Sequence, residues 1–195
     1  MDQSKPALGR EYPCTIKLDN GTSMTLRLMT PRDSEGILAF ARSLPEADLL
    51  FLRSDITNPV VVRNWVENIE EGRTVTLLAE VSGELSGYAS LHYNETTWQR
   101  HLGEIRIQVG QRYRSQGLGK ALAGEIFSIA RNLGVRKIMA QMTPDQKGAI
   151  ATFERLGFQP EALLQDFVID RSGRTRDLVI MANDVTGLSD NVESR

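Results

Sequence analysis

Cysteine and histidine are scarce in this 195-residue chain, which contains one cysteine, Cys14, and two histidines. A single cysteine cannot form a disulfide within the chain, and so few soft ligands make a poor structural zinc site. No segment approaches the roughly 18 consecutive apolar residues of a membrane span. The beginning of the chain also lacks the apolar core of a signal peptide. We therefore expect no metal cofactor, no membrane segment and a reducing, cytoplasmic location.

An excess of positive charge is also missing. The chain has 23 Lys and Arg against 25 Asp and Glu, which gives a formal net charge of -2 and a pI of about 5.8. Proteins that bind duplex nucleic acid through its phosphates carry a strongly basic surface, so we expect no nucleic-acid partner. Hydrophobic residues make up 41% and charged residues 25%, as in a typical globular enzyme or binding domain.

The length predicts one domain, because chains of this size usually form a single core. Both ends of the chain are polar and lack a period that could bury one face. We expect flexible tails over residues 1–13 and 184–195, and a single domain over residues 14–183.

Hydrophobic periodicity places helices and strands in a mixed order. A hairpin is expected over residues 14–29, because alternating residues flank Asp19-Asn20-Gly21. Further strands are expected over residues 74–81, 85–93, 103–109 and 135–142, with a closing hairpin over 162–169 and 175–182. Helices are expected after the N-cap Asp33 and over residues 46–51, 59–71, 118–133 and 146–156. This order indicates an α/β (mixed α+β) fold with a mixed sheet flanked by helices.

The most informative stretch joins a predicted strand to the long helix that begins near Leu118. Its loop contains Arg112 and Arg114 but no acidic residue, and it ends in Gly117-Leu118-Gly119. Glycines there let a ligand approach the backbone, and the free N–H groups and dipole of the helix favour a pyrophosphate. The loop lacks both the Gly-Lys-Ser/Thr ending of a nucleotide-hydrolysing loop and the third glycine of a dinucleotide fingerprint. A tight turn without a ligand would show the same two glycines.

Two motifs together resemble the GNAT superfamily of N-acetyltransferases. Arg114-x-x-Gly117-x-Gly119 resembles its coenzyme A signature, and Gln146 to Phe158 resembles its closing helix with a Gly-Phe exit. With the opening and closing hairpins in the right order, the resemblance covers residues 24–182. It implies a GNAT-like fold with a splayed sheet, acetyl-CoA as co-substrate, and similarity to bacterial protein-lysine acetyltransferase domains.

The resemblance implies a role for each part of the motif. The backbone of Ile107, Gln108 and Val109 should flank the pantetheine and the thioester, where the strand bulges away from its neighbour. The N–H of Val109 should polarise the thioester carbonyl, an effect worth roughly 3 kcal/mol in acyl transfer. The strand over residues 135–142 should splay from the preceding one. The residues expected to hold the pyrophosphate are Arg114, Ser115, Gln116, Gly117, Leu118, Gly119 and Lys120.

The chain departs from the family pattern twice in its last helix. Gln146 stands where the family usually has Asn, and Phe153 stands where many members have a Tyr that protonates the leaving thiolate. Both positions are still expected to contact the co-substrate. Phenylalanine has no proton to give, so another group must act as the general acid if one is needed.

Glu104 is the candidate general base. The segment from Gly103 to Val109 resembles the strand in which protein-lysine acetyltransferases carry a catalytic Glu. Alternation puts Glu104 on one face with Arg106 and Gln108. Glu104 could equally pair with Arg106 or Arg100 on a solvated face.

Function is expected to be acetyl transfer to a primary amine, carried by a small molecule or a protein lysine. Two alternatives stay open, namely a catalytically silent acyl-CoA sensor, which Phe153 would suit, and a nucleotide-binding domain. His92 and His101 could shuttle a proton but are expected to be surface or half-buried residues. The sequence leaves a homodimer open.

Overall fold

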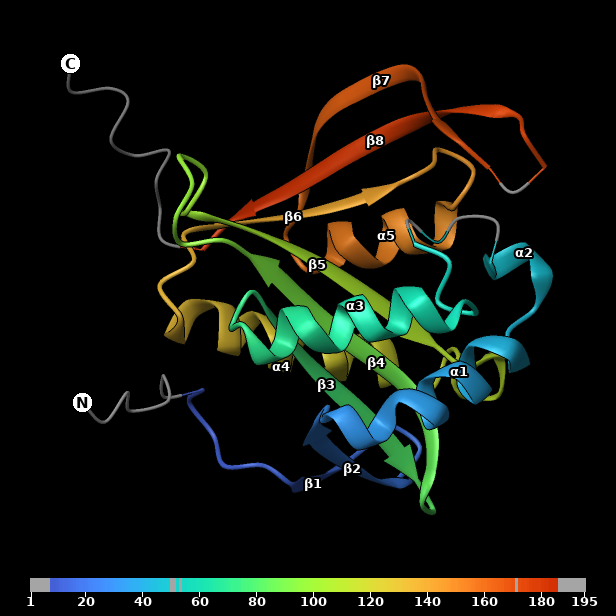
Figure 1. Cartoon of the computed structure of the whole chain (residues 1–195), viewed down its shortest axis with the longest axis vertical. Coiled ribbons are helices and arrows are strands. Elements are labelled where there is room, and N and C mark those ends of the chain that lie inside the picture. Colours follow the sequence, from blue (N-terminus) through green and yellow to red (C-terminus); the bar gives the residue numbers. More distant parts are fainter. Residues whose placement is uncertain (1–7, 50–51, 53, 171, 186–195) are drawn as a thin grey trace.

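The computed structural model describes residues 8–49, 52, 54–170 and 172–185, and one eight-stranded sheet runs through it in the order β1-β2-β3-β4-β5-β6-β8-β7 (Figure 1). Neighbouring strands are antiparallel except β5 and β6, which are parallel. The strands are β1 (Cys14–Lys17), β2 (Ser23–Leu28), β3 (Thr74–Val81), β4 (Glu84–Tyr93), β5 (Leu102–Val109), β6 (Lys137–Met142), β7 (Gln159–Ile169) and β8 (Thr175–Asp184). The expected mixed α+β architecture is confirmed.

Helices cover both faces of the sheet (Figure 1). The helices are α1 (Ser34–Ser43), α2 (Glu46–Leu49), α3 (Pro59–Glu70), α4 (Leu118–Asn132) and α5 (Lys147–Arg155). One core joins α1 and α3 to the sheet, for example through Phe40, Trp65 and Tyr88. The other joins α4 and α5 to the opposite face, for example through Ile126 and Phe153. Two separate cores therefore fix the sheet between the helical layers.

Most expected elements are present, with small differences at their ends. The helix expected over 46–51 is seen as α2, and residues 50 and 51 lie outside the described part. The first strand of the closing hairpin begins earlier than expected, at Gln159. In the hairpin over 14–29, Gly21 has φ +82°, whereas Asn20 is not left-handed. Instead, the Asn20 side chain accepts a hydrogen bond from Thr22 N (2.9 Å) and closes a longer turn.

Part of the expected N-terminal tail contacts α4. Arg10 Nη1 and the Tyr12 hydroxyl both donate to the Glu125 carboxylate, at 2.8 and 3.0 Å. Leu8 and Tyr12 pack against the α4-side core. At the other end, β8 continues to Asp184, one residue beyond the expected boundary of the domain.

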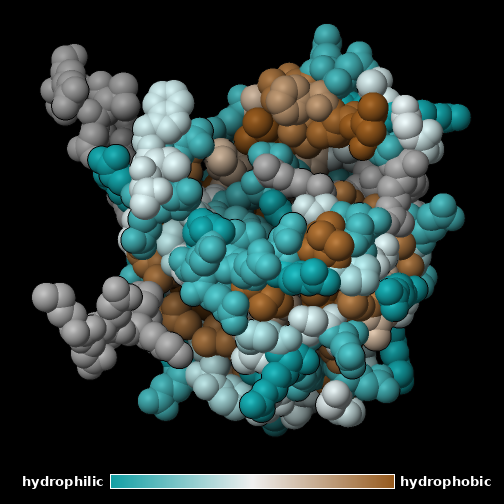
Figure 2. Space-filling model, viewed as in Figure 1, coloured by the Kyte–Doolittle hydropathy of each residue, from teal (hydrophilic) through white to brown (hydrophobic). Residues whose placement is uncertain are grey.

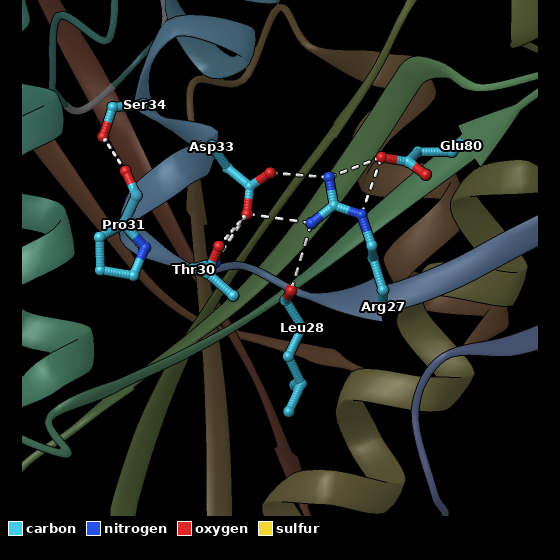
Figure 3. A network of polar contacts seen from close by, with 7 residues as sticks. All are labelled: Arg27, Leu28, Thr30, Pro31, Asp33, Ser34 and Glu80. Carbon is cyan, nitrogen blue, oxygen red and sulfur yellow. Dashed lines mark hydrogen bonds and ion pairs between the residues drawn. The ribbon is translucent and has the colours of Figure 1, made fainter.

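Asp33 occupies the N-cap position of α1, as expected, but its side chain does not bond to the helix amides. It accepts instead from Thr30 N (2.7 Å) and from both terminal nitrogens of Arg27 (Figure 3). Arg27 also donates to Glu80 of β3 through Nε and Nη2, at 2.8 and 2.6 Å. Partial burial alone would raise the pKa of Asp33, but its bonds to Arg27 and Thr30 lower it overall. The network ties β2, β3 and the start of α1 together.

The surface over α3 is largely hydrophilic, whereas apolar side chains gather over the β7–β8 hairpin (Figure 2). Leu163, Phe167 and Ile169 of β7 are exposed. Within the described part of the chain, no helix is long and apolar enough to cross a membrane, and no group of three metal-ligating side chains comes together.

Candidate active site

The parallel strands β5 and β6 separate after a short paired stretch. Pairing runs from Leu102–Lys137 to Glu104–Met139, after which β6 pairs only with β8 among the described residues. Figure 1 shows the two strands diverging toward the end of β5. The expected splay is therefore present. The expected bulge in β5 is not, because the β4–β5 register continues without a shift from Tyr93–Gly103 to Gly87–Val109.

A cleft of about 750 Å³, a volume that includes space open to solvent, lies at this separation. Its walls come from β5, β6, α5 and the segment before α3. Four of the predicted site residues line the cleft. They are Glu104, Ile107 and Gln108 of β5 and Phe153 of α5. Gln146 lines it as well. The cleft thus joins β5 to the motif that begins at Gln146, whereas Val109 and residues 114–120 are not among its described lining residues.

The backbone of Val109 faces the unpaired edge of β5. Gly110 N donates to Ser86 O of β4 at 2.8 Å. Because a trans peptide points its N–H and C=O in opposite directions, the Val109 carbonyl points away from β4. It accepts there from Arg114 Nε and Nη2, each at 3.3 Å. In an antiparallel ladder the N–H and C=O of one residue share a side, so the Val109 N–H also faces the separation, and Ile107 does so by alternation.

The loop after β5 leads into α4 with two residues in the left-handed region, Ser115 (φ +58°) and Gly117 (φ +86°). Helix α4 begins at Leu118, which is fully buried and anchors the turn in the core. The first-turn amides of a helix have no partner within the helix. No acidic residue lies in the first turn of α4. This end of α4 therefore presents positively polarised N–H groups.

The two glycines of the loop differ in what the protein requires of them. A Cβ on Gly117 would lie 2.7 Å from an Asp19 carboxylate oxygen, and its φ also favours glycine. A Cβ on Gly119 would make only an ordinary 3.6 Å contact with Val109 Cγ2. Packing within the chain thus leaves room for a methyl group at Gly119. Its missing side chain instead leaves space at the helix terminus for a ligand.

Side chains of the same loop contact other elements. Arg114 forms an ion pair with Asp48 of α2. Gln116 Nε2 donates to Arg112 O (2.7 Å), and its Oε1 accepts from Asn20 in the β1–β2 turn (2.8 Å). Lys120 is exposed on the first turn of α4. The hairpin at the start of the chain therefore supports the loop, a contact that local sequence did not indicate.

Glu104 lies where β5 and β6 begin to separate, and it is largely buried. Its Oε1 accepts from Arg106 Nε at 3.0 Å. The pairing with Arg106 considered as an alternative role is therefore present. It does not remove Glu104 from the cleft, because both side chains line the same cavity.

The closing helix presents an apolar side chain to the cleft. Phe153 is 9% exposed, lines the cleft and packs edge-on against Phe158, with ring centroids 4.9 Å apart. Gln146 Oε1 accepts from Thr143 N (3.0 Å) and closes the turn that precedes α5.

A second hollow adjoins the cleft beneath α3. Its lining includes Asn64, Trp65 and Asn68 of α3 and Ser90, His92 and Arg106 of the sheet. His92 is half-buried, with its ring nitrogens 2.9 Å from Ser90 Oγ and 3.1 Å from Thr74 Oγ1. Tyr88 lines both this hollow and the cleft. Tyr88 was not among the residues predicted from the sequence, although alternation with Ser90 and His92 along β4 places the three side chains on one face.

The model of the Acetyltransferase (GNAT) family matches residues 39–158, more than half of the chain. YwnH of Bacillus subtilis (strain 168), a protein named for phosphinothricin acetylation, is 26% identical over 170 residues, covering 84% of this chain and 100% of YwnH. The L-amino acid N-acetyltransferase AaaT of Escherichia coli (strain K12) is 24% identical over 120 residues, covering 60% of this chain and 74% of AaaT.

Solved structures share the fold. A GNAT-family acetyltransferase of Streptococcus pneumoniae aligns with a TM-score of 0.72 at 21% identity, covering 83% of this chain and 99% of that one. YncA of Salmonella typhimurium, solved with acetyl-CoA, aligns with a TM-score of 0.70 at 24% identity, covering 83% and 94%. The splayed sheet, the glycine loop and these matches agree, and the chain belongs to the acetyltransferase (GNAT) family as an acyl-CoA-dependent N-acetyltransferase with acetyl-CoA as its co-substrate.

Proposed function

We propose that the protein transfers the acetyl group of acetyl-CoA to the primary amine of a small molecule by direct attack in the cleft between β5 and β6. One observation carries the proposal: the strands separate immediately after Glu104. The Glu104 carboxylate then lines the cleft, and the N–H groups of Ile107 and Val109 face the separation on the same strand. A proton acceptor and an oxyanion donor on one strand would suit direct acetyl transfer.

The residues present fit the co-substrate. The pyrophosphate would bind the amides from Ser115 to Lys120, where the terminus of α4 favours an anion and Gly119 leaves room. The pantetheine arm would extend along the unpaired edge of β5, beside Ile107 and Gln108, with Gln146 and Phe153 across the cleft. The co-substrate supplies an activated acetyl thioester.

The N–H of Val109 would donate to the thioester carbonyl and stabilise negative charge as the amine attacks. A preorganised donor of this kind is worth roughly 3 kcal/mol in acyl transfer. Arg114 donates to the backbone carbonyl of Val109, and this contact fixes the orientation of the strand end. A donor held in this way would be in position before the substrates bind.

Glu104 would accept the proton of the attacking amine. An ordinary alkylamine has a pKa of about 10.4, so a base is useful at neutral pH. Arg106 holds the carboxylate in place through its 3.0 Å bond. The departing thiol, with an ordinary pKa of about 8.5, can leave without a strong acid, which suits a cleft that has Phe153 at the usual position of the acid.

The acceptor is a small molecule in this proposal because AaaT is named for L-amino acids and YwnH for phosphinothricin, itself a small amine. A protein lysine is the other candidate, from the resemblance of the strand around Glu104 to lysine acetyltransferases. A silent acyl-CoA sensor would keep the glycine loop but would not need a carboxylate in the cleft. The position of Glu104 supports the enzyme.

The test is steady-state kinetics of thiol release with acetyl-CoA and a panel of amino acids, polyamines and lysine peptides. Glu104→Gln should lower kcat about 100-fold or more while the Kd for CoA stays unchanged. Glu95→Gln, an exposed change in the β4–β5 loop, is the matched control and should retain full activity. Unchanged turnover in Glu104→Gln would reject the proposed base. Turnover of lysine peptides alone would reject the small acceptor.

A further inference from the structure

The cleft and the hollow beneath α3 meet at one pair of opposite charges, Glu104 and Arg106. Both side chains project from the same face of β5, two residues apart, with Arg106 Nε and Glu104 Oε1 3.0 Å apart. Glu104 lines only the cleft, whereas Arg106 lines both the cleft and the hollow. An amine bound at Glu104 would therefore lie next to the guanidinium.

Arg106 has hydrogen-bonding capacity left for a ligand. Of its three nitrogens, only Nε has a partner within residues 8–49, 52, 54–170 and 172–185. Its side chain is 29% exposed, so the two terminal nitrogens are neither sealed in the core nor fully hydrated. A planar guanidinium matches the geometry of a carboxylate better than that of any neutral group.

Tyr88 adds a second donor beside Arg106. It is 4% exposed and lines both spaces. In the described part of the chain its hydroxyl bonds to no other group. Burial raises the pKa of Tyr88 to about 12, against a smaller opposing effect of Arg106, so the phenol is protonated at neutral pH and can donate. Its ring is held by Trp65 and Phe40, at centroid distances of 5.0 and 6.2 Å.

The described walls of the hollow carry no permanent charge besides Arg106. Arg106 is the one permanently charged side chain among its described lining residues, which otherwise include Asn64, Asn68, Ser90 and Trp65. Glu104 balances the charge of Arg106 from the side of the cleft, and no described lining residue of the hollow carries a carboxylate that would attract a positive group. A negative group would gain a charge-assisted bond. The hollow is therefore suited to an anionic part of the acceptor.

We infer that the acceptor is an α-amino acid, whose amine is placed at Glu104 while Arg106 and Tyr88 bind its carboxylate. In such a molecule the two charged groups are separated by one carbon atom, which suits side chains two residues apart on a strand. The inference rests on the proposed function and makes it more specific. Polyamines, and lysine residues within a protein, lack the carboxylate and would place no anion beside Arg106.

The test compares each amino acid with the amine that lacks only its carboxylate. Suitable pairs are L-leucine with 3-methylbutan-1-amine and L-glutamine with 4-aminobutanamide. Thiol release is measured at saturating acetyl-CoA for the wild type, Arg106→Gln, Arg106→Lys and the control Arg100→Gln, an exposed residue of the β4–β5 loop. Comparing each variant with the wild type on the same acceptor removes differences in amine basicity.

Arg106→Gln should lower kcat/KM for the amino acids about 10- to 100-fold, chiefly through KM, because a charge-assisted bond is lost. For the amines without a carboxylate, kcat/KM should fall only through the lost bond to Glu104, so their loss should be about fivefold or more smaller than that of the amino acids. Arg106→Lys should give a KM for the amino acids between those of the wild type and Arg106→Gln, because lysine keeps the charge but not the planar geometry. Arg100→Gln should match the wild type, and thermal unfolding confirms that each variant is folded.

Equal losses for both members of each pair would overturn the inference and leave the acetyltransferase proposal standing. Wild-type preference for polyamines or lysine peptides over amino acids would also overturn it. No thiol release with any acceptor would reject the proposed function itself, and the inference with it. The two failures are therefore distinguishable.

Discussion

Glu104 of β5 and Met139 of β6 form the last pair of the parallel ladder, and the strands separate immediately beyond them. This places a carboxylate at the closed end of the separation rather than within an ordinary sheet face. The free edge that follows, including the N–H of Val109, lies on the same strand. The proposed activity therefore depends on a break in strand pairing as much as on side chains.

Replacing Gly119 by Ala should weaken co-substrate binding without weakening the fold. The added methyl group would make only a 3.6 Å contact within the protein, and Ala favours a helix over Gly by about 1 kcal/mol. It would, however, occupy the space left for the diphosphate. Overpacking of about 1–3 kcal/mol corresponds to a Kd for CoA raised about 5- to 150-fold, measured by titration calorimetry.

Gly124→Ala is the control for this change. It lies in the same helix, and a Cβ there would meet nothing within 4 Å. Its thermal stability should rise as in Gly119→Ala while its Kd for CoA stays at the wild-type value. If both variants bound CoA like the wild type, the diphosphate would not lie against Gly119.

Phe153→Tyr should raise kcat if protonation of the thiolate limits turnover. The residue lines the cleft, so a hydroxyl added to it is available to the departing group. A positioned general acid typically raises the rate by about 100-fold or more, so kcat could rise by up to about that factor. Initial rates between pH 6 and 9 at saturating acetyl-CoA measure the effect.

Phe158→Tyr provides the contrast, because Phe158 is fully buried. Its new hydroxyl would lack a partner and should lower the free energy of unfolding by about 1–3 kcal/mol without raising kcat. An unchanged kcat in a folded Phe153→Tyr variant would show that the leaving thiolate needs no acid here.

Asp33→Asn should destabilise the fold at neutral pH through the network of Figure 3. The pKa of Asp33 is lowered in the folded state, so its contribution to stability is present above the ordinary value of 3.8 and is lost as pH falls through the folded value. Loss of the charged bonds to Arg27 should cost about 1.5–3 kcal/mol at pH 7. The difference from wild type should shrink near pH 3, as measured by urea unfolding.

Glu71→Gln is the matched control for that measurement. Glu71 pairs with Arg73 at the surface, with about half of each side chain exposed. Exposed pairs contribute about 0–1 kcal/mol, so this variant should unfold close to the wild type at both pH values. A similar loss in the two variants would show that the Arg27 network contributes no more than a surface pair.

The sequence by itself determined the order of the helices and strands and the position of the glycine loop before α4. Helical periods, the Asn20-Gly21 turn and the spacing of Arg114, Gly117 and Gly119 are local properties, because each depends on residues close together in the chain. Alternation along β5 also predicted correctly that Glu104 and Arg106 share a face. These features needed no knowledge of distant contacts.

Only the tertiary structure decided which distant residues meet at the site. The cleft opens because β6 leaves β5 to pair with β8, whose strand comes some forty residues later in the chain. Tyr88 reaches the same space from β4, and Asp48 reaches Arg114 from α2. The expected bulge in β5 is absent because the β4 pairing continues to Val109. Such contacts depend on strand order and packing between segments far apart in sequence, which local patterns do not encode.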